Sequence, residues 1–171
     1  MNYKQIILSD IAVEDANDYI NLHKIINTEN PYMIRPSGQY EVPAKQIEQE
    51  AIEHGEKAFK YWKVLRIEGQ LAGHIRLSRS SKQRLKHKAE LTIGLQEKYT
   101  GSGLGKMMLE DCISWCNSNG IERLDLHVVS ENFRGIALYK KYGFKEVGLL
   151  KNDIKVSENI YYDSVYMTKH L

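Results

Sequence analysis

A glycine-rich segment that joins a predicted strand to a predicted helix constrains this chain more than any other feature. Residues 93–106 read IGLQEKYTGSGLGK, with Gly101, Gly103 and Gly105 at alternate positions. Glycine lets a backbone turn tightly and approach a ligand without a Cβ in the way. The first N–H groups of the helix that follows have no partner within it, and with the helix dipole they favour an anion. The segment therefore predicts a phosphate or pyrophosphate site, to which Lys106 adds positive charge.

The segment differs from two common phosphate-binding motifs. A Walker A loop requires Ser or Thr after Gly-Lys, but Lys106 is followed by Met107, and Thr100 stands where the first glycine belongs. A dinucleotide fingerprint requires GxGxxG, and the spacing here is GxGxG. Asp125 lies about twenty residues further on, but inside a predicted strand instead of at its end. A nucleotide-binding oxidoreductase domain is therefore disfavoured.

Hydrophobic periodicity predicts an α/β fold in one domain, residues 1–171. No repeat, low-complexity tract or linker interrupts the chain. The predicted order is β-α-α-β-β-β-α-β-α-β-β, which indicates a mixed sheet with helices packed on it. The expected strands are 4–8, 61–67, 71–77, 89–95, 124–128, 144–149 and 161–167, and the expected helices end near Asn27, Gly55, Gly120 and Gly143.

Local signals set several boundaries of these elements. Asp15 is expected to cap the first helix, and Pro43 suits the first turn of the second. Residues 68–70, Glu-Gly-Gln, are expected to form a three-residue hairpin loop. The basic stretch 76–88 is expected to be a solvated loop between strands.

Composition and charge narrow the class of protein. The chain is 42% hydrophobic and 27% charged with a net charge of +2, so we expect no nucleic-acid partner. No apolar stretch approaches the length of a membrane span, and residues 1–10 do not resemble a signal peptide. Cys112 and Cys116 lie one helical turn apart without further ligands nearby, so we expect buried cysteines and no metal. Together these features predict a cytoplasmic protein without a membrane partner.

A second motif lies downstream, in residues 132–144, Asn-Phe-Arg-Gly-Ile-Ala-Leu-Tyr-Lys-Lys-Tyr-Gly-Phe. The pattern N-x-x-x-x-A-L-Y-x-x-x-G-F, preceded by a glycine turn of the R/Q-x-x-G-x-G/A type, resembles the GNAT superfamily of N-acetyltransferases. The resemblance covers the whole domain and is strongest from about His87 to the C-terminus, where residues 162–167 are similar to the last strand of bacterial members. The two motifs in this order are far more specific than either alone. Thr100 departs from the family pattern, which has Arg or Gln at that position.

The resemblance implies a GNAT-type mixed, mostly antiparallel central sheet, flanked by helices and splayed at an acetyl-CoA site. It implies that acetyl-CoA donates an acetyl group directly to a primary amine, of a small molecule or a peptide N-terminus, in a ternary complex without a metal. Strand backbone groups would hold the pantetheine arm, and the glycine turn would hold the pyrophosphate. The implied cofactor-binding residues are Ile93, Gly94, Leu95, Thr100, Gly101, Ser102, Gly103, Leu104, Gly105, Lys106, Asn132 and Tyr139.

Acetyl transfer to an amine requires a base for the ammonium and an acid for the departing thiolate. Tyr139 is the natural acid, because the pKa values of a phenol and a thiol are not far apart. Its alternative role is an aromatic packed under the sheet. Glu90 and His127 are the preferred bases, ahead of His87, and each has an alternative interpretation as an ordinary polar residue of a strand or loop.

The acceptor side is less readable. By resemblance it lies between the first two helices, where Glu29 would recognise a cationic amine and Tyr32 would form a wall, or where the segment is simply an ordered surface loop. A homodimer is expected from the resemblance and from the tyrosine-rich strand 160–166, an exposed edge that would need covering. The alternative function is a non-catalytic acetyl-CoA-binding regulatory module on the same fold.

Overall fold

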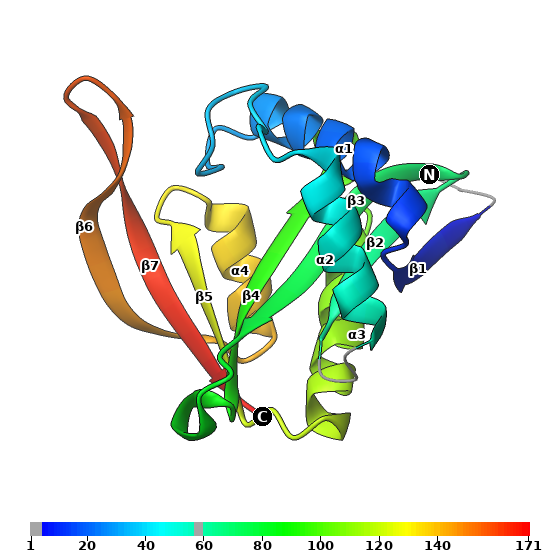
Figure 1. The fold of residues 1–171 in the computed structure, drawn as a ribbon. Helices are drawn as coiled ribbons and strands as arrows, with labels where there is room; N and C mark the ends of the chain where they lie inside the picture. The colour runs from blue at the N-terminus through cyan, green and yellow to red at the C-terminus, as the bar shows by residue number, and fades with distance from the viewer. Residues whose placement is uncertain (1–4, 57–59) are drawn as a thin grey trace. The chain divides into compact units, whose positions relative to one another are not determined.

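The computed structural model describes residues 5–56 and 60–171, and its elements follow the predicted order (Figure 1). The strands form one sheet in the order β1-β2-β3-β4-β5-β7-β6. The β4–β5 pair is parallel, whereas the β1–β2, β2–β3, β5–β7 and β6–β7 pairs are antiparallel. The expected fold class, a mixed and mostly antiparallel sheet flanked by helices, is confirmed. The bounds are β1 Ile6–Asp10, α1 Ala16–Glu29, α2 Ala44–Glu56, β2 Trp62–Ile67, β3 Gln70–Arg79, β4 Lys88–Leu95, α3 Leu104–Ser118, β5 Arg123–Val129, α4 Phe133–Lys141, β6 Lys145–Ser157 and β7 Ile160–His170.

The chain divides into two compact units. The first comprises Met1–Leu77 and Thr92–Trp115, and the second comprises Ser78–Leu91 and Cys116–Leu171. Strands β3 and β4 and helix α3 each contribute residues to both units. The expectation of one N-acetyltransferase domain over residues 1–171 stays a prediction.

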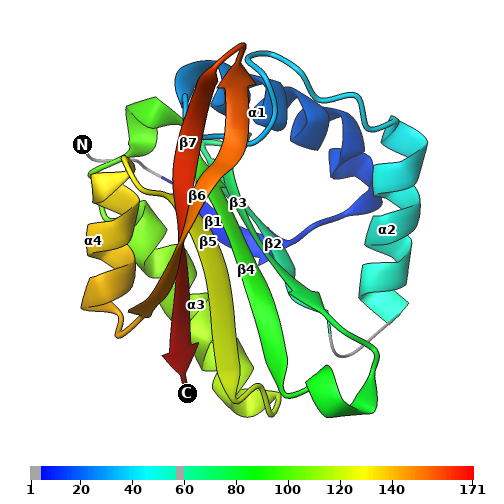
Figure 2. The same ribbon diagram turned by 90° about the vertical axis from the view of Figure 1, so that its left-hand side faces the viewer.

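In the first unit, α1 and α2 lie on one side of β2 and β3, and α3 lies on the other (Figure 2). Alternation along β2 explains this arrangement, since adjacent side chains of a strand point to opposite faces. Trp62 belongs to the buried cluster that includes Tyr19 of α1 and Ile47 of α2. The neighbouring Tyr61 faces α3, where its hydroxyl donates to Asp111 at 2.7 Å and its ring lies 5.3 Å from that of Trp115.

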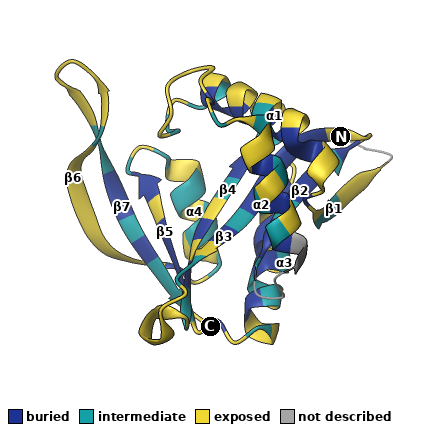
Figure 3. Cartoon of the chain, viewed as in Figure 1, coloured by how far each residue is buried: buried dark blue, intermediate teal, exposed yellow. Residues whose placement is uncertain are grey.

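In the second unit, β6 and β7 form a long twisted hairpin (Figure 1). From the sequence we expected the first strand of this hairpin to end near residue 149. In the structure β6 continues to Ser157 because it stays paired with β7. The expectation that 160–166 is an edge strand is therefore wrong. β7 lies between β5 and β6, and β6 is the edge strand, exposed along nearly its whole length (Figure 3).

Three local expectations also need correction. The hairpin loop between β2 and β3 has two residues, not three, because Gln70 pairs with Ile67. Asp15 precedes α1 as expected but makes no side-chain cap; its carboxylate accepts from the Ala12 N–H and from Arg66.

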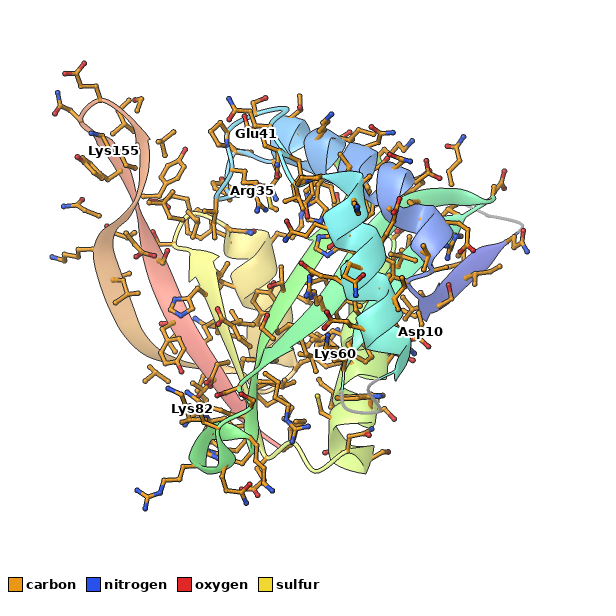
Figure 4. The ribbon with its side chains drawn as sticks, viewed as in Figure 1. Asp10, Arg35, Glu41, Lys60, Lys82 and Lys155 are labelled. Carbon is orange, nitrogen blue, oxygen red and sulfur yellow. The ribbon has the colours of Figure 1, made fainter. Side chains whose placement is uncertain are left out.

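The basic stretch 76–88 is only partly a loop. Arg76 and Arg79 lie on β3, and Lys88 begins β4. The loop between these strands carries Lys82, which is labelled in Figure 4.

A substitution at Gly69 tests the two-residue turn between β2 and β3. In this turn Glu68 and Gly69 both have positive φ, 50° and 84°. Such a turn matches the twist of the flanking strands. Because a residue with a Cβ costs about 1–2 kcal/mol in the left-handed region, Gly69→Ala should lower the free energy of unfolding by about that amount. Chemical denaturation measures it.

Gly148→Ala is the matched control, since a Cβ at Gly148 would have nothing within 4 Å and its φ is not positive. Equal stability of the two variants would contradict the assigned turn.

Candidate active site

In the glycine turn of the first unit, the backbone conformation explains why glycine is required. Gly101 and Gly103 have φ of 75° and 87°, and a Cβ built on either would have nothing within 4 Å. Left-handed backbone, and not crowding by protein atoms, therefore selects glycine at both positions. Helix α3 begins at Leu104, directly after the second of these residues. Its first N–H groups follow an exposed turn that leaves room for an anion.

Hydrogen bonds fix the segment that leads into this turn. The side chain of Gln96 is buried and donates to the Leu71 carbonyl at 3.0 Å, while its backbone N–H donates to the Ala72 carbonyl at 2.9 Å. The Thr100 hydroxyl donates to the Glu97 carbonyl at 2.8 Å. The turn thus starts from a rigid attachment to β3.

Glu29 and Tyr32, proposed from the sequence as acceptor-binding residues, lie in the same unit as the turn. A carboxylate oxygen of Glu29 accepts from the Glu97 N–H at 2.8 Å, so this side chain holds the segment before the glycines. The backbone N–H of Tyr32 donates to the Asn30 side chain at 2.9 Å, in the α1–α2 connection. Lys106 lies 3.7 Å from Glu110, one turn along α3, with both side chains about half exposed.

Asn132 and Tyr139 lie in the second unit, at the start and within α4. The Asn132 side-chain oxygen accepts from the Gly135 N–H at 2.9 Å and caps the helix. This bond uses the oxygen, so what Asn132 can offer a ligand is its amide NH₂. The half-buried Tyr139 ring packs edge-on against Phe144 with 5.8 Å between ring centres. Burial raises the pKa of Tyr139 to about 12.

A cavity of about 510 Å³ in the second unit brings together Glu90 and His127, the two bases preferred from the sequence. It is lined by β3, β4, β5, β6 and β7. Glu90 lies opposite Asp125 in the β4–β5 ladder, and His127 lies opposite Tyr166 in the β5–β7 ladder with 4.9 Å between their rings. His87 is not among the lining residues; its carbonyl accepts from the Glu122 N–H at 2.8 Å.

Charged and polar groups of the cavity are arranged around Asp125. Its carboxylate accepts from Arg123 at 2.8 Å and lies 3.7 Å from Lys88. Its Oδ1 atom is buried and has no hydrogen-bond partner among the described residues. Burial, and then the Asp125 carboxylate, raise the pKa of Tyr166. The cavity therefore combines two carboxylates, Glu90 and Asp125, and two cations, Arg79 and Lys88, with an apolar wall from Val147, Leu149 and Leu150.

Sequence reasoning missed Asp125 and Tyr166 as site residues. The signal for Asp125 was present, since it precedes His127 by two positions and side chains two apart on a strand share a face.

It also missed a buried polar cluster of the first unit, formed by Tyr19, His23, Tyr40 and His74. The His23 and His74 rings lie 4.3 Å apart, and His23 stacks on Tyr40 at 4.3 Å. Arg35, labelled in Figure 4, lies 4.6 Å from the Tyr40 ring centre. A histidine inside an apolar strand was the available signal, at His74.

Burial keeps both imidazoles neutral. It lowers the pKa of His23 to about 4, helped by Arg35 and Arg76, and holds the pKa of His74 well below its ordinary value, helped by His23 and Arg76. The Nε2 atoms of both rings are buried and lack a hydrogen-bond partner within residues 5–56 and 60–171.

The residues that the structure describes lack two further features. No three His, Cys, Asp or Glu side chains among them are grouped so that they could hold a metal ion. None of their helices combines the length and the apolar character needed to cross a membrane.

Residues 21–144 match the model of the acetyltransferase (GNAT) family. The chain belongs to this family.

Two curated relatives of this chain are named as N-acetyltransferases. The chain is 28% identical over 104 residues to the L-amino acid N-acetyltransferase AaaT of Escherichia coli, across 60% of this chain and 64% of that protein. It is 29% identical over 89 residues to the N-alpha-acetyltransferase RimI of Mycobacterium tuberculosis, across 52% of this chain and 54% of that one. In both cases the match spans less than two thirds of the relative's length.

Solved structures share the fold over nearly the whole chain. A GNAT-family acetyltransferase from Streptococcus pneumoniae has a TM-score of 0.92 at 21% identity, covering 98% of this chain and all of that one. A phosphinothricin acetyltransferase from Sinorhizobium meliloti, solved with acetyl-CoA, has a TM-score of 0.82 at 17% identity, covering 97% of this chain and 88% of that one.

The buried histidines predict that stability depends on pH. The unfolded chain protonates His23 below its ordinary pKa of about 6.5, whereas the folded chain resists protonation until about pH 4. The unfolded state therefore binds more protons in this window, and the free energy of unfolding should fall as pH drops through it. Each excluded proton contributes about 1.4 kcal/mol per pH unit. Arg35 and Arg76 strengthen the effect, and Arg76 itself pairs with Glu50 at 2.8 Å.

Chemical denaturation between pH 7 and pH 4.5 measures this dependence. His23→Phe keeps a ring on Tyr40 and removes the titrating group, so its pH dependence should be shallower than that of the wild type. Identical slopes would contradict a neutral, buried His23.

Proposed function

We propose that this chain is an acetyl-CoA-dependent N-acetyltransferase that moves an acetyl group to a primary amine in a ternary complex. The observation that carries the proposal is the turn in which Gly101 and Gly103 have positive φ directly before α3. Family membership, the fold of a neighbour solved with acetyl-CoA and the names of the curated relatives support it. A single domain over residues 1–171 and a cytoplasmic location, in keeping with two buried cysteines, are part of the same proposal.

The residues of the turn fit the pyrophosphate of the donor. N–H groups at residues 101–106 would donate to the phosphate oxygens, and Lys106 would add charge near them. The turn does not need the missing Arg or Gln at position 100, because its exposed backbone and the start of α3 already supply donors. Residues 93–95 and the Asn132 amide NH₂ are proposed to hold the pantetheine arm.

Tyr139 is proposed to protonate the departing thiolate. Burial raises its pKa to about 12, so the phenol is protonated at neutral pH but is a weaker acid than an ordinary tyrosine. Acetyl-CoA supplies the activated acetyl thioester, and no metal is required. A backbone N–H of the strand would stabilise the negative charge that develops on the carbonyl oxygen.

The base and the acceptor site are proposed to share the cavity of the second unit. Glu90 and His127 both line it, and either would take the ammonium proton directly or through water. A small-molecule amine or a peptide N-terminus fits a cavity of about 510 Å³ with two carboxylates and an apolar wall. The names of AaaT and RimI, an amino acid and an N-alpha acetyltransferase, agree with these two acceptor classes. Glu29 is assigned to holding the glycine turn, and Tyr32 keeps its proposed place as a wall for the acceptor.

Thiol release from acetyl-CoA in the presence of amino acids, peptides, polyamines and aminoglycosides tests the function. Wild-type protein should release thiol with at least one acceptor class. Tyr139→Phe keeps the ring and should lower kcat and kcat/KM together by about 10²–10⁴-fold, with cofactor affinity and melting temperature near normal. Normal turnover in this variant would assign Tyr139 to packing.

Gly103→Asp is the contrasting variant. It introduces a carboxylate into the proposed pyrophosphate site and should abolish acetyl-CoA binding in calorimetry without unfolding the protein. A wild type that binds acetyl-CoA but never releases thiol would favour the regulatory module instead.

A homodimer is also proposed, now on the exposed β6–β7 hairpin. Large apolar side chains with 43–61% exposure gather on it, namely Val147, Leu149, Leu150, Val156 and Ile160. An exposed apolar edge of this kind requires a cover.

Light scattering should therefore give twice the chain mass of 19.8 kDa. Val156→Glu should shift the protein toward monomer, whereas Leu85→Glu, at a 38% exposed apolar residue outside the hairpin, should not. A monomeric wild type at high concentration would remove the dimer.

A further inference from the structure

The side chain of His74 occupies the space beside Gly94, in the middle of the strand segment proposed to hold the pantetheine arm. His74 lies on β3 and is 1% exposed. A Cβ built on Gly94 would lie 2.7 Å from His74 Nε2, 3.1 Å from its Cδ2 and 3.3 Å from the Cδ1 of Ile26. Protein Cβ atoms essentially never approach a heavy atom within 3.0 Å. The imidazole therefore restricts position 94 to glycine.

The His74 ring is held in place by its neighbours. The hydroxyl of Tyr19 lies 3.5 Å from His74 Nδ1, and the Tyr19 ring meets the imidazole edge-on at 5.4 Å. On another side the His23 ring lies 4.3 Å away. Because all three side chains are buried, the imidazole cannot swing away to make room at position 94.

A second contact fixes the same stretch of β4 from β3. A Cβ on Gly73 would lie 2.8 Å from the Gly94 carbonyl oxygen and 2.9 Å from the Cδ1 of Leu95. Neither strand can move toward the other, and the two glycines permit an approach that larger residues would prevent. Gly94 is thus positioned by the His74 side chain and by the backbone of Gly73.

Stability alone does not account for a histidine at position 74. Its Nε2 is buried without a partner in the described part of the chain, which costs about 1–3 kcal/mol relative to a satisfied or apolar group. A leucine would avoid this cost. The polar edge of the ring is instead directed at the strand segment 93–95.

We infer that His74 is a positioning residue for cofactor binding, which sets where the Gly94 backbone lies and so aligns the donor groups of residues 93–95. The inference rests on the proposed function, because it is acetyl-CoA that the aligned strand would hold. A larger residue at 94 displaces β4 from the imidazole, and a smaller residue at 74 relieves that displacement.

A double-mutant cycle tests the inference. Acetyl-CoA affinity by calorimetry and melting temperature are measured for wild type, Gly94→Ala, His74→Ala and the double variant. Gly94→Ala should weaken acetyl-CoA binding about tenfold, and His74→Ala should also weaken it, because the strand loses its support. The fold loss of acetyl-CoA affinity in the double variant should be smaller than the product of the fold losses in the two single variants.

His23→Phe is the matched control, because His23 packs against the same imidazole but is not among the atoms near the Gly94 Cβ. It should change the melting temperature without changing acetyl-CoA affinity, whereas His74→Ala should change both. If Gly94→Ala fails to fold, the comparison of His23→Phe with His74→Ala tests the role of His74 without it.

The outcomes separate the two ideas. A folded wild type that does not bind acetyl-CoA refutes the proposed function, and the role of His74 falls with it. A wild type that binds, combined with additive effects in the cycle or with normal affinity of His74→Ala, overturns the positioning role and leaves the proposed function intact.

Discussion

The close approach of β3 and β4 at Gly73 and Gly94 is the constraint on which the first unit depends. Two glycines let the strands come within a distance that any Cβ would prevent, and the His74 ring closes the helix-facing side. Immediately after this contact, Gln96 attaches the chain to β3 through its backbone and its side chain. The glycine turn therefore starts from a fixed point, and the orientation of its N–H groups follows from how β4 is held.

The buried polar groups of the two units differ in the partners that surround them. In the first unit, the Nε2 atoms of His23 and His74 are buried without a hydrogen-bond partner among the described residues, and burial lowers the pKa of both imidazoles. In the second unit, the Asp125 side chain is also buried, and its carboxylate pairs with Arg123 and lies near Lys88. An uncompensated charge is too costly to bury, whereas a compensated one is tolerated. The first unit thus buries an uncharged polar cluster, whereas the cavity of the second unit is lined by side chains of both charges.

The order of elements could be read from the sequence because it depends on local signals. Periodicity, Pro43, Gly120 and Gly143 mark helices and strands without knowledge of the partner segments. The length of β6 could not be read in this way. Residues 150–157 mix polar residues with Leu150, Ile154 and Val156 and are mostly exposed, and they form a strand because β7 pairs with them. Strand edges have the same limitation, since the sheet order that makes β6 the edge is a property of the tertiary fold.

The candidate site shows the same division between local and tertiary information. The glycine turn and the Asn132–Tyr139 motif each have their own sequence pattern, so both could be proposed as site segments from the sequence. Glu29 was proposed from the sequence as an acceptor-binding residue, and the sequence alone could not show that its carboxylate accepts from the Glu97 N–H, 68 residues away. A histidine inside an apolar strand marked His74 as unusual, but its contact with Gly94, twenty residues further along the chain on the neighbouring strand, could not be read from the sequence.

Glycine can therefore be required at a position for either of two physical reasons, and the sequence alone does not tell which one applies. Gly101 and Gly103 are required by their own positive φ and have open space around them. Gly73 and Gly94 have ordinary φ and are required by what their neighbours occupy. The first kind belongs to turns and is found from the local sequence, whereas the second marks a contact between segments. In this chain Gly73 and Gly94 support the strand that leads into the turn of Gly101 and Gly103, so the geometry of the turn depends on a packing contact in the core.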